Sequence, residues 1–233
     1  MNKCFYSIIF VLLTTFVLNG CIASRPVLNA FVDPDRKSEY AFGANPVIIK
    51  DNISRDSFPV DQPVYSPVSI TYSRIVNDRF EWGFGLSGLY QKLAFVPSED
   101  YEELDVDNLA ITQFSNVYGL LLGEYREAVV DGGLLVGIPF NKAFSLTSGI
   151  CCRYFSSSDE FSTDSTGNRI NYVYTATNMY FPISLIAGNK NHKIACGFEV
   201  PLELKENYYK NGNPLQYDNH TNFVLRVSYF YLR

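Results

Sequence analysis

The chain of 233 residues has little of what catalysis or metal binding needs. It contains two histidines, His192 and His220, and it lacks an HExxH motif, a CxxC pair, a glycine-rich phosphate loop and an EF-hand pattern. Lysine and arginine are scattered without a basic block and the formal net charge is −5, which argues against a nucleic-acid partner. We therefore predict a protein that is not an enzyme, with no cofactor and no metal site.

Long hydrophobic runs are also absent, apart from residues 5–17, an apolar stretch of about a dozen residues. A transmembrane helix needs roughly 20 apolar residues, so this stretch is typical of a signal peptide. Residues 18–21 (LNGC) resemble the lipobox of bacterial lipoproteins, which implies a signal peptide over residues 1–20 and lipidation of Cys21 as the first mature residue. Cleavage after Ala23 is the alternative, because residues 21–23 also satisfy the small-x-small rule. Both interpretations predict export from a bacterial cytoplasm.

Helix-forming stretches are few, whereas aromatic residues make up 15% of the chain, which indicates a β protein. The mature chain has the length of one domain. Residues 21–37 contain two prolines and several charges, and they read as a tether. The barrel domain described next is expected over residues 38–233.

Several stretches alternate between large apolar residues on one face and small or polar residues on the other. In residues 80–88, for example, Phe80, Trp82 and Phe84 alternate with Glu81, Gly83 and Gly85. The same pattern occurs in residues 66–76, 143–154, 193–203 and 221–232. A soluble sandwich alternates as well, but a narrow barrel needs a small or polar interior and an apolar, aromatic exterior. The pattern therefore favours an antiparallel up-and-down β-barrel.

Connection lengths favour the same fold, because long and short connections alternate along the chain, as in membrane barrels with short periplasmic turns and long outer loops. This gives eight strands, near residues 38–49, 66–76, 79–94, 127–140, 143–155, 169–187, 193–205 and 221–232. An even number returns both ends of the domain to one side. Residues 111–126 are assigned to an extension of the fourth strand, and an extra hairpin there is the alternative, which would make ten strands.

The closing residues 223–233 alternate, with Tyr231 as their last aromatic residue before Leu232 and Arg233, and residues 132–146 have the pattern of a barrel hairpin. On these residues and strands the chain resembles small Gram-negative outer-membrane β-barrel proteins. The resemblance implies a location in the bacterial outer membrane, contact with its lipid, and recognition of the last strand by the barrel-assembly machinery. It implies a fold and a place far more than an activity.

A group of charged residues falls on the face expected to point into the barrel. Charges in a lumen are costly when unpaired, so we predict an internal salt-bridge network. Its expected members are Glu81, Arg153, Glu199, Glu203 and Arg226. Eight strands enclose an interior that side chains fill, so a closed lumen is favoured over a narrow charged pore.

The remaining chemical candidates have simpler interpretations. Cys151 and Cys152 are neighbours on a strand and point to opposite faces, so they cannot share one metal ion. Cys152 and Cys196 face outward on strands two apart, about 9–10 Å, beyond disulfide reach. The acidic run at residues 98–107 lies in a predicted outer loop and lacks the spacing of a calcium site. His220, in another predicted outer loop, has no serine motif beside it.

We therefore expect an outer-membrane β-barrel with a structural or surface-interaction role carried by its outer loops. Three alternatives remain. A soluble, lipid-anchored barrel or sandwich that binds an apolar ligand would turn the aromatic faces inward. A small porin would need ten or more strands. A lipid-modifying enzyme would lose activity on His220→Ala.

Overall fold

The structure, a computed structural model, describes residues 26–32, 36–49, 68–77, 79–85, 88–96, 109–122, 125–141, 143–163, 166–189, 191–215 and 223–233. Regular structure in this part of the chain consists of β-strands. They are β1 (Ser38–Ile49), β2 (Val68–Ile75), β3 (Phe80–Gly85), β4 (Gly88–Val96), β5 (Ala110–Leu122), β6 (Tyr125–Asn141), β7 (Phe144–Thr163), β8 (Arg169–Gly188), β9 (His192–Lys210), β10 (Asn213–Leu215) and β11 (Phe223–Leu232).

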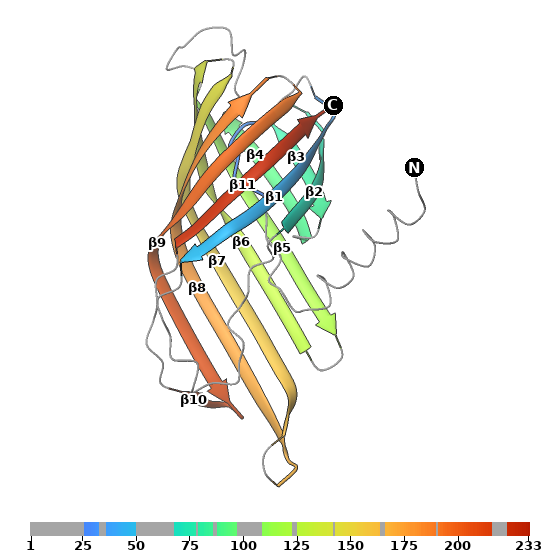
Figure 1. The fold of residues 1–233 in the computed structure, drawn as a ribbon, viewed down its shortest axis with the longest axis vertical. Coiled ribbons are helices and arrows are strands. Elements are labelled where there is room, and N and C mark those ends of the chain that lie inside the picture. The colour runs from blue at the N-terminus through green and yellow to red at the C-terminus, as the bar shows by residue number, and fades with distance from the viewer. Residues whose placement is uncertain are drawn as a thin grey trace, which may run out of the picture.

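Ten of these strands form one closed antiparallel barrel (Figure 1). Each strand from β1 to β9 pairs with the next one along the chain, and β11 closes the ring between β9 and β1. The short strand β10 pairs with residues 208–210 of β9 and adds nothing to the wall. The predicted all-β up-and-down barrel is confirmed, with the ten strands of the alternative assignment instead of eight.

The two additional strands come from one region of the sequence. The predicted single strand 79–94 is a hairpin of β3 and β4, and residues 111–126 form most of β5 and the start of β6. Gly85 pairs with Gly88 at the tip of the hairpin, and Gly88 has a φ of 88°, a conformation that favours glycine. Only two residues separate β3 from β4, and across them the outward positions change from even numbers, as at Phe84, to odd numbers, as at Leu89.

We call the end of the barrel where β1 begins and β11 ends the terminal end, and the opposite end the distal end. Arg233 N donates to Ser38 O at 2.9 Å, so the two ends of the barrel domain are adjacent. Strands β4 and β5 also meet at the terminal end, where Val96 is paired with Ile111. The chain between them therefore leaves from the terminal end and not, as predicted, from the outer end, since the extra turn after β3 reverses its direction.

Strand lengths differ strongly around the barrel. Strands β7 and β8 have 20 residues each and β9 has 19, whereas β3 has 6. The long strands extend well past the short ones at the distal end (Figure 1). The barrel is therefore a closed ring with a taller wall on the side of β5 to β9.

Side chains alternate between the two faces of the wall, as the sequence pattern predicts. The outward side chains are large and apolar, and many are more than a third exposed: Phe42, Trp82, Phe84, Leu89, Phe95, Val130, Leu134, Phe144, Ile150, Leu185, Ile194 and Phe198. The inward side chains of the terminal half include many small or polar ones: Ala41, Ser69, Thr71, Ser73, Thr112, Thr147, Ser184, Ala195 and Ser228.

Part of the predicted tether lies inside the barrel. Residues 27–32 are all buried, with relative exposures from 0 to 4%. We call residues 26–32 (PVLNAFV) the lumen segment. A tether in solvent was expected because of the prolines and charges on either side of these residues, but the run between them is mostly apolar and is buried by the barrel wall.

Candidate functional site in the barrel interior

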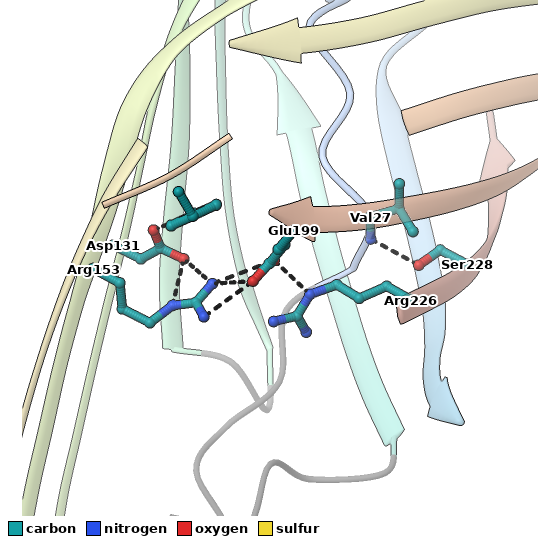
Figure 2. A network of polar contacts seen from close by, with 7 residues as sticks. Val27, Asp131, Arg153, Glu199, Arg226 and Ser228 are labelled. Carbon is teal, nitrogen blue, oxygen red and sulfur yellow. Dashed lines mark hydrogen bonds and ion pairs between the residues drawn. The ribbon is translucent and has the colours of Figure 1, made fainter. Parts of the chain in front are cut away.

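A chain of buried ionic contacts crosses the interior from β6 to β11 (Figure 2). Arg153 Nε and Nη2 donate to Asp131 Oδ2 at 3.1 and 2.9 Å, across a directly opposed pair of β6 and β7. Arg153 Nη1 also donates to Glu199 Oε2 on β9 at 3.2 Å. Arg226 Nε on β11 donates to Glu199 Oε1 at 2.7 Å. The hydroxyl of Tyr180 on β8 donates to Asp131 Oδ1 at 2.6 Å.

These five residues, which we call the charge network, are electrically balanced. Two carboxylates alternate with two guanidinium groups, and every member is at most 6% exposed. The Arg153 guanidinium also lies 4.9 Å from the centre of the Tyr180 ring. Charges buried to this extent are tolerated only when their attraction and hydrogen bonds offset the cost of removing them from water. The alternation of charge along the chain of contacts meets that condition.

A second buried pair lies closer to the terminal end. Glu81 on β3 faces Lys92 on β4 directly, and Lys92 Nζ lies 2.7 Å from Glu81 Oε2 with both side chains 1% exposed. Ser73 Oγ on β2 donates to the other oxygen of Glu81. Lys92 Nζ also donates to Phe31 O of the lumen segment at 3.2 Å. The pair thus joins the wall to the lumen segment.

Four of the five charged residues expected in the lumen point into it. Arg153, Glu199 and Arg226 belong to the charge network, and Glu81 belongs to the separate pair with Lys92. The two groups use different strands, so the single network of the sequence analysis is two groups in the structure.

Glu203, the fifth residue, lies outside the lumen, and its assignment there was wrong. Its side chain is 51% exposed and pairs with the exposed Lys205 at 2.8 Å. The reason is a bulge in β9: Met179 on β8 is paired with Glu203, but Tyr180 is paired with Pro201. In a regular strand, Glu199 and Glu203 would face the same side. The one extra residue of β9 at the bulge shifts the alternation, so Glu199 faces inward and Glu203 faces outward.

Sequence reasoning missed three members of these groups, namely Asp131, Lys92 and Tyr180. A usable pattern was present for two of them. Asp131 is an isolated charge in an apolar, glycine-rich strand (VVDGGLLVG), and Lys92 is the only charge in GLYQKLAFV. Each faces a charged residue on the adjacent strand, Arg153 and Glu81 respectively, but that pairing is visible only once the register is known.

The lumen segment is held by side chains from four strands. Val27 N donates to Ser228 Oγ at 2.8 Å, which Figure 2 shows beside the charge network. Ala30 N donates to Thr147 Oγ1 at 3.1 Å, and Ala30 O accepts from Thr112 Oγ1 at 2.5 Å. With the bond from Lys92 to Phe31 O, these contacts satisfy buried backbone groups that no strand partner satisfies.

Inward glycines make room for the lumen segment. A Cβ on Gly137 of β6 would lie 2.7 Å from the ring of Phe31, and one on Gly197 of β9 would lie 3.0 Å from Val27 Cγ1. A Cβ on Gly43 of β1 would lie 3.5 Å from Pro26 Cα and closer still to two serine hydroxyls. The segment and the wall therefore fit each other closely.

The number of strands explains why a filler is needed. Eight strands enclose a space that wall side chains just fill, and the diameter grows with each added strand. Ten strands lined by glycine, serine and threonine leave more space than their own side chains occupy. The lumen segment fills it, and its residues belong to all three apolar clusters of the terminal half: Leu28, Ala30 and Phe31 in the first, Val27 in the second and Val32 in the third.

The exterior carries aromatic rings in contact around part of the terminal end. His192 on β9 lies 5.3 Å from Tyr231 on β11, measured between ring centroids, and Tyr231 lies 6.3 Å from Tyr40 on β1. Tyr40 lies 5.0 Å from Tyr72 on β2, which contacts Phe84 on β3 at 5.8 Å. We call these five residues the aromatic girdle. The soluble alternative required large aromatic residues to point inward, and these point outward.

The structure also places the cysteines and one histidine considered in the sequence analysis. Cys151 is buried, and Cys152 and Cys196 lie on the outer face of β7 and β9. His192 begins β9 and its Nδ1 lies 2.5 Å from the Tyr229 hydroxyl. Cys21, the acidic run at 98–107 and His220 lie outside the described residues.

Among the described residues, no helix is long and apolar enough to cross a membrane. In the same part of the chain, no three His, Cys, Asp or Glu side chains are grouped so that they could hold a metal ion.

No family model, no curated protein and no solved structure matches the chain. Fold and surface alone therefore define its class, which is a ten-stranded antiparallel β-barrel with an apolar exterior and an interior filled by apolar clusters and buried ion pairs.

Proposed function

We propose that this protein is an integral barrel of the bacterial outer membrane, with a structural or surface-interaction role and no catalysis. The observation that carries the proposal is the distribution of side chains across the wall. Buried inward positions hold ion pairs and hydroxyl groups beside apolar clusters, while outward positions hold exposed phenylalanine, leucine, isoleucine and valine on every strand from β3 to β9. A barrel in lipid requires this distribution.

The energetics of the exterior support lipid as the surrounding solvent. Soluble proteins rarely expose one apolar patch beyond a few hundred Å², whereas exposed apolar side chains here surround most of the barrel. The aromatic girdle suits a membrane–water interface, where tyrosine places its ring in the lipid and its hydroxyl in water. A closed barrel also leaves no unpaired strand edge for lipid to meet.

Orientation follows from the position of the two ends of the domain. In the proposal the terminal end faces the periplasm, where an exported and N-terminally lipidated chain would be anchored at Cys21. The distal end, with the taller wall of β5 to β9, would then face outward and carry any surface interaction. Strand β11, with Tyr229 and Tyr231 outward, would be read by the barrel-assembly machinery.

The ten strands also meet the requirement set for the small-porin alternative. What favours a closed barrel over an open porin is the interior, where the lumen segment and the charge network are buried. The porin alternative stays a second candidate because ten strands could enclose a pore if the lumen segment were absent.

Membrane fractionation followed by gel mobility with and without boiling tests the proposal. An integral barrel stays in the outer-membrane pellet after carbonate extraction, and its band shifts on boiling because the folded barrel resists detergent. As a control, a lipid-anchored soluble protein from the same fraction should show no shift. Release of the protein by carbonate, or identical mobility of cold and boiled samples, would refute the membrane barrel and return the soluble alternative.

A further inference from the structure

We propose that the lumen segment, residues 26–32, closes a water-filled pathway for small cations through the barrel. The inference rests on the proposed membrane location and goes beyond it, since it assigns a transport activity to the interior and a gate to one segment. The lumen segment fills the closed ring. Each of the three apolar clusters in the terminal half contains residues of the lumen segment.

The wall behind the lumen segment carries hydroxyl groups among its apolar residues. Its inward residues include Thr112 and Thr147, which bond to Ala30, and Ser228, which bonds to Val27. Ser69 Oγ is buried and has no hydrogen-bond partner, and its inward neighbours on β2, Thr71 and Ser73, are polar too. Without the segment, these hydroxyl groups would face water, beside apolar wall residues of the same clusters such as Phe114, Leu135 and Phe230.

The attachment of the segment is suited to release. It pairs with no strand, and its backbone is bound to the wall through side chains: the hydroxyls of Ser228, Thr147 and Thr112, and the ammonium of Lys92. A few such bonds and the burial of apolar side chains hold it, so it could leave while every backbone hydrogen bond of the barrel stays intact. The close fit at Gly137 and Gly197 shows that the wall is shaped for this occupant.

The charge of the interior sets the expected selectivity. Among the described residues, the buried carboxylates are Glu39, Glu81, Glu127, Asp131 and Glu199, and the buried cations are Lys92, Arg153 and Arg226. Among these fully buried groups, carboxylates outnumber cations, and acidic linings admit cations and exclude anions. The pathway would therefore conduct potassium or sodium in preference to chloride.

The test is single-channel recording in planar bilayers, with the full chain reconstituted as wild type and as Leu28→Asp/Phe31→Asp. Two carboxylates in the apolar clusters should expel the lumen segment from the lumen into water. A matched control, Asn207→Asp/Asn213→Asp, adds the same charge at two exposed positions. We expect a silent wild type and control, and discrete steps from the double variant whose reversal potential in a KCl gradient shifts toward that of potassium.

A cross-link tests the same gate by another route. Because Val27 N bonds to Ser228 Oγ, the two residues are neighbours, and a Val27→Cys/Ser228→Cys pair is chosen to be joined by a disulfide. Placed in the milder Leu28→Ser/Phe31→Ser variant, with the native cysteines replaced by serine, the disulfide should silence the channel and a reducing agent should restore it. This second variant also decides the matter if the aspartate variant fails to insert.

Several outcomes would overturn the inference. Silent variants whose bands still shift on boiling would mean that wall side chains close the barrel by themselves, while the membrane proposal would stand. Equal conductance of wild type and variant, or selectivity for chloride, would refute the gate or the charge argument respectively. A wild-type protein that fails to insert at all would refute the proposed function itself, which the boiling shift reports separately.

Discussion

Removal of Arg153 should strongly destabilise the barrel, because this residue joins both carboxylates of the charge network. Arg153→Met keeps a side chain of similar length and abolishes the bonds to Asp131 at 2.9 and 3.1 Å and to Glu199 at 3.2 Å. Asp131 would keep the bond from Tyr180, and Glu199 would keep the bond from Arg226. Asp131 would nevertheless lose its guanidinium partner and Glu199 one of its two, and breaking a buried pair typically costs about 3–5 kcal/mol of unfolding free energy.

Urea titration of the protein in lipid vesicles measures this loss, with the fluorescence of the single tryptophan, Trp82, as the signal. Lys205→Met is the matched control, because it removes an ion pair that is exposed on the outer face, and we expect no measurable change. Arg226→Met should fall between the two, since Arg226 bonds to one carboxylate of the network and Arg153 bonds to two.

A double substitution separates charge from packing. Asp131→Asn combined with Arg153→Met should cost less than Arg153→Met alone, because the neutral amide no longer needs the counter-charge. The reasoning would be refuted if Arg153→Met lowered the unfolding free energy by under about 1 kcal/mol. It would also be refuted if the double variant lost as much unfolding free energy as the two single variants added together.

Three further predictions concern the wall and its outer face. Phe198 is 53% exposed on the outer face of β9, the strand between β8 and β11. Phe198→Arg should lower the unfolding free energy in vesicles by about 2–4 kcal/mol, whereas Asn207→Arg should lower it little. Equal effects of the two substitutions in urea titrations would contradict a lipid-facing exterior. Gly133→Ala should lower the melting temperature, because its Cβ would lie 2.4 Å from a carbonyl oxygen of β7. Gly119→Ala should not, because its Cβ would lie at an ordinary contact distance of 3.9 Å from Glu127 O, and calorimetry in detergent compares the two variants. Cys152, with the other cysteines replaced by serine, should react in vesicles with an apolar maleimide and resist a charged one, and fast labelling by the charged reagent would count against burial in lipid.

The sequence was sufficient for the fold class because a barrel wall imposes one rule on every strand. Alternation of large apolar with small or polar residues identified the outward face of β3 from Phe80, Trp82 and Phe84, and the exposures agree. The error in strand number came from overlooking a shift in that alternation. A two-residue turn moves the outward positions from even numbers, as at Phe84, to odd numbers, as at Leu89, and the glycines at 85 and 88 mark the place.

The interior was less predictable, because its contacts depend on register and on chain reversal. The alternation of inward and outward side chains correctly placed Arg153, Glu199 and Arg226 inside. One bulge in β9 turned Glu203 outward, and a bulge has no reliable sequence pattern. The lumen segment was harder still. Its apolar residues have no period, and their burial depends on glycines more than 100 residues away, at 137 and 197.

The central claim, that the outer face of this barrel meets lipid, is tested most directly at Trp82. This residue lies on the outer face of β3, 41% exposed, and it is the only tryptophan of the chain. In vesicles made with lipids brominated on their acyl chains, the account predicts strong quenching of Trp82 fluorescence and little quenching by iodide in the surrounding water. Strong quenching by iodide together with no effect of the brominated lipids would contradict it.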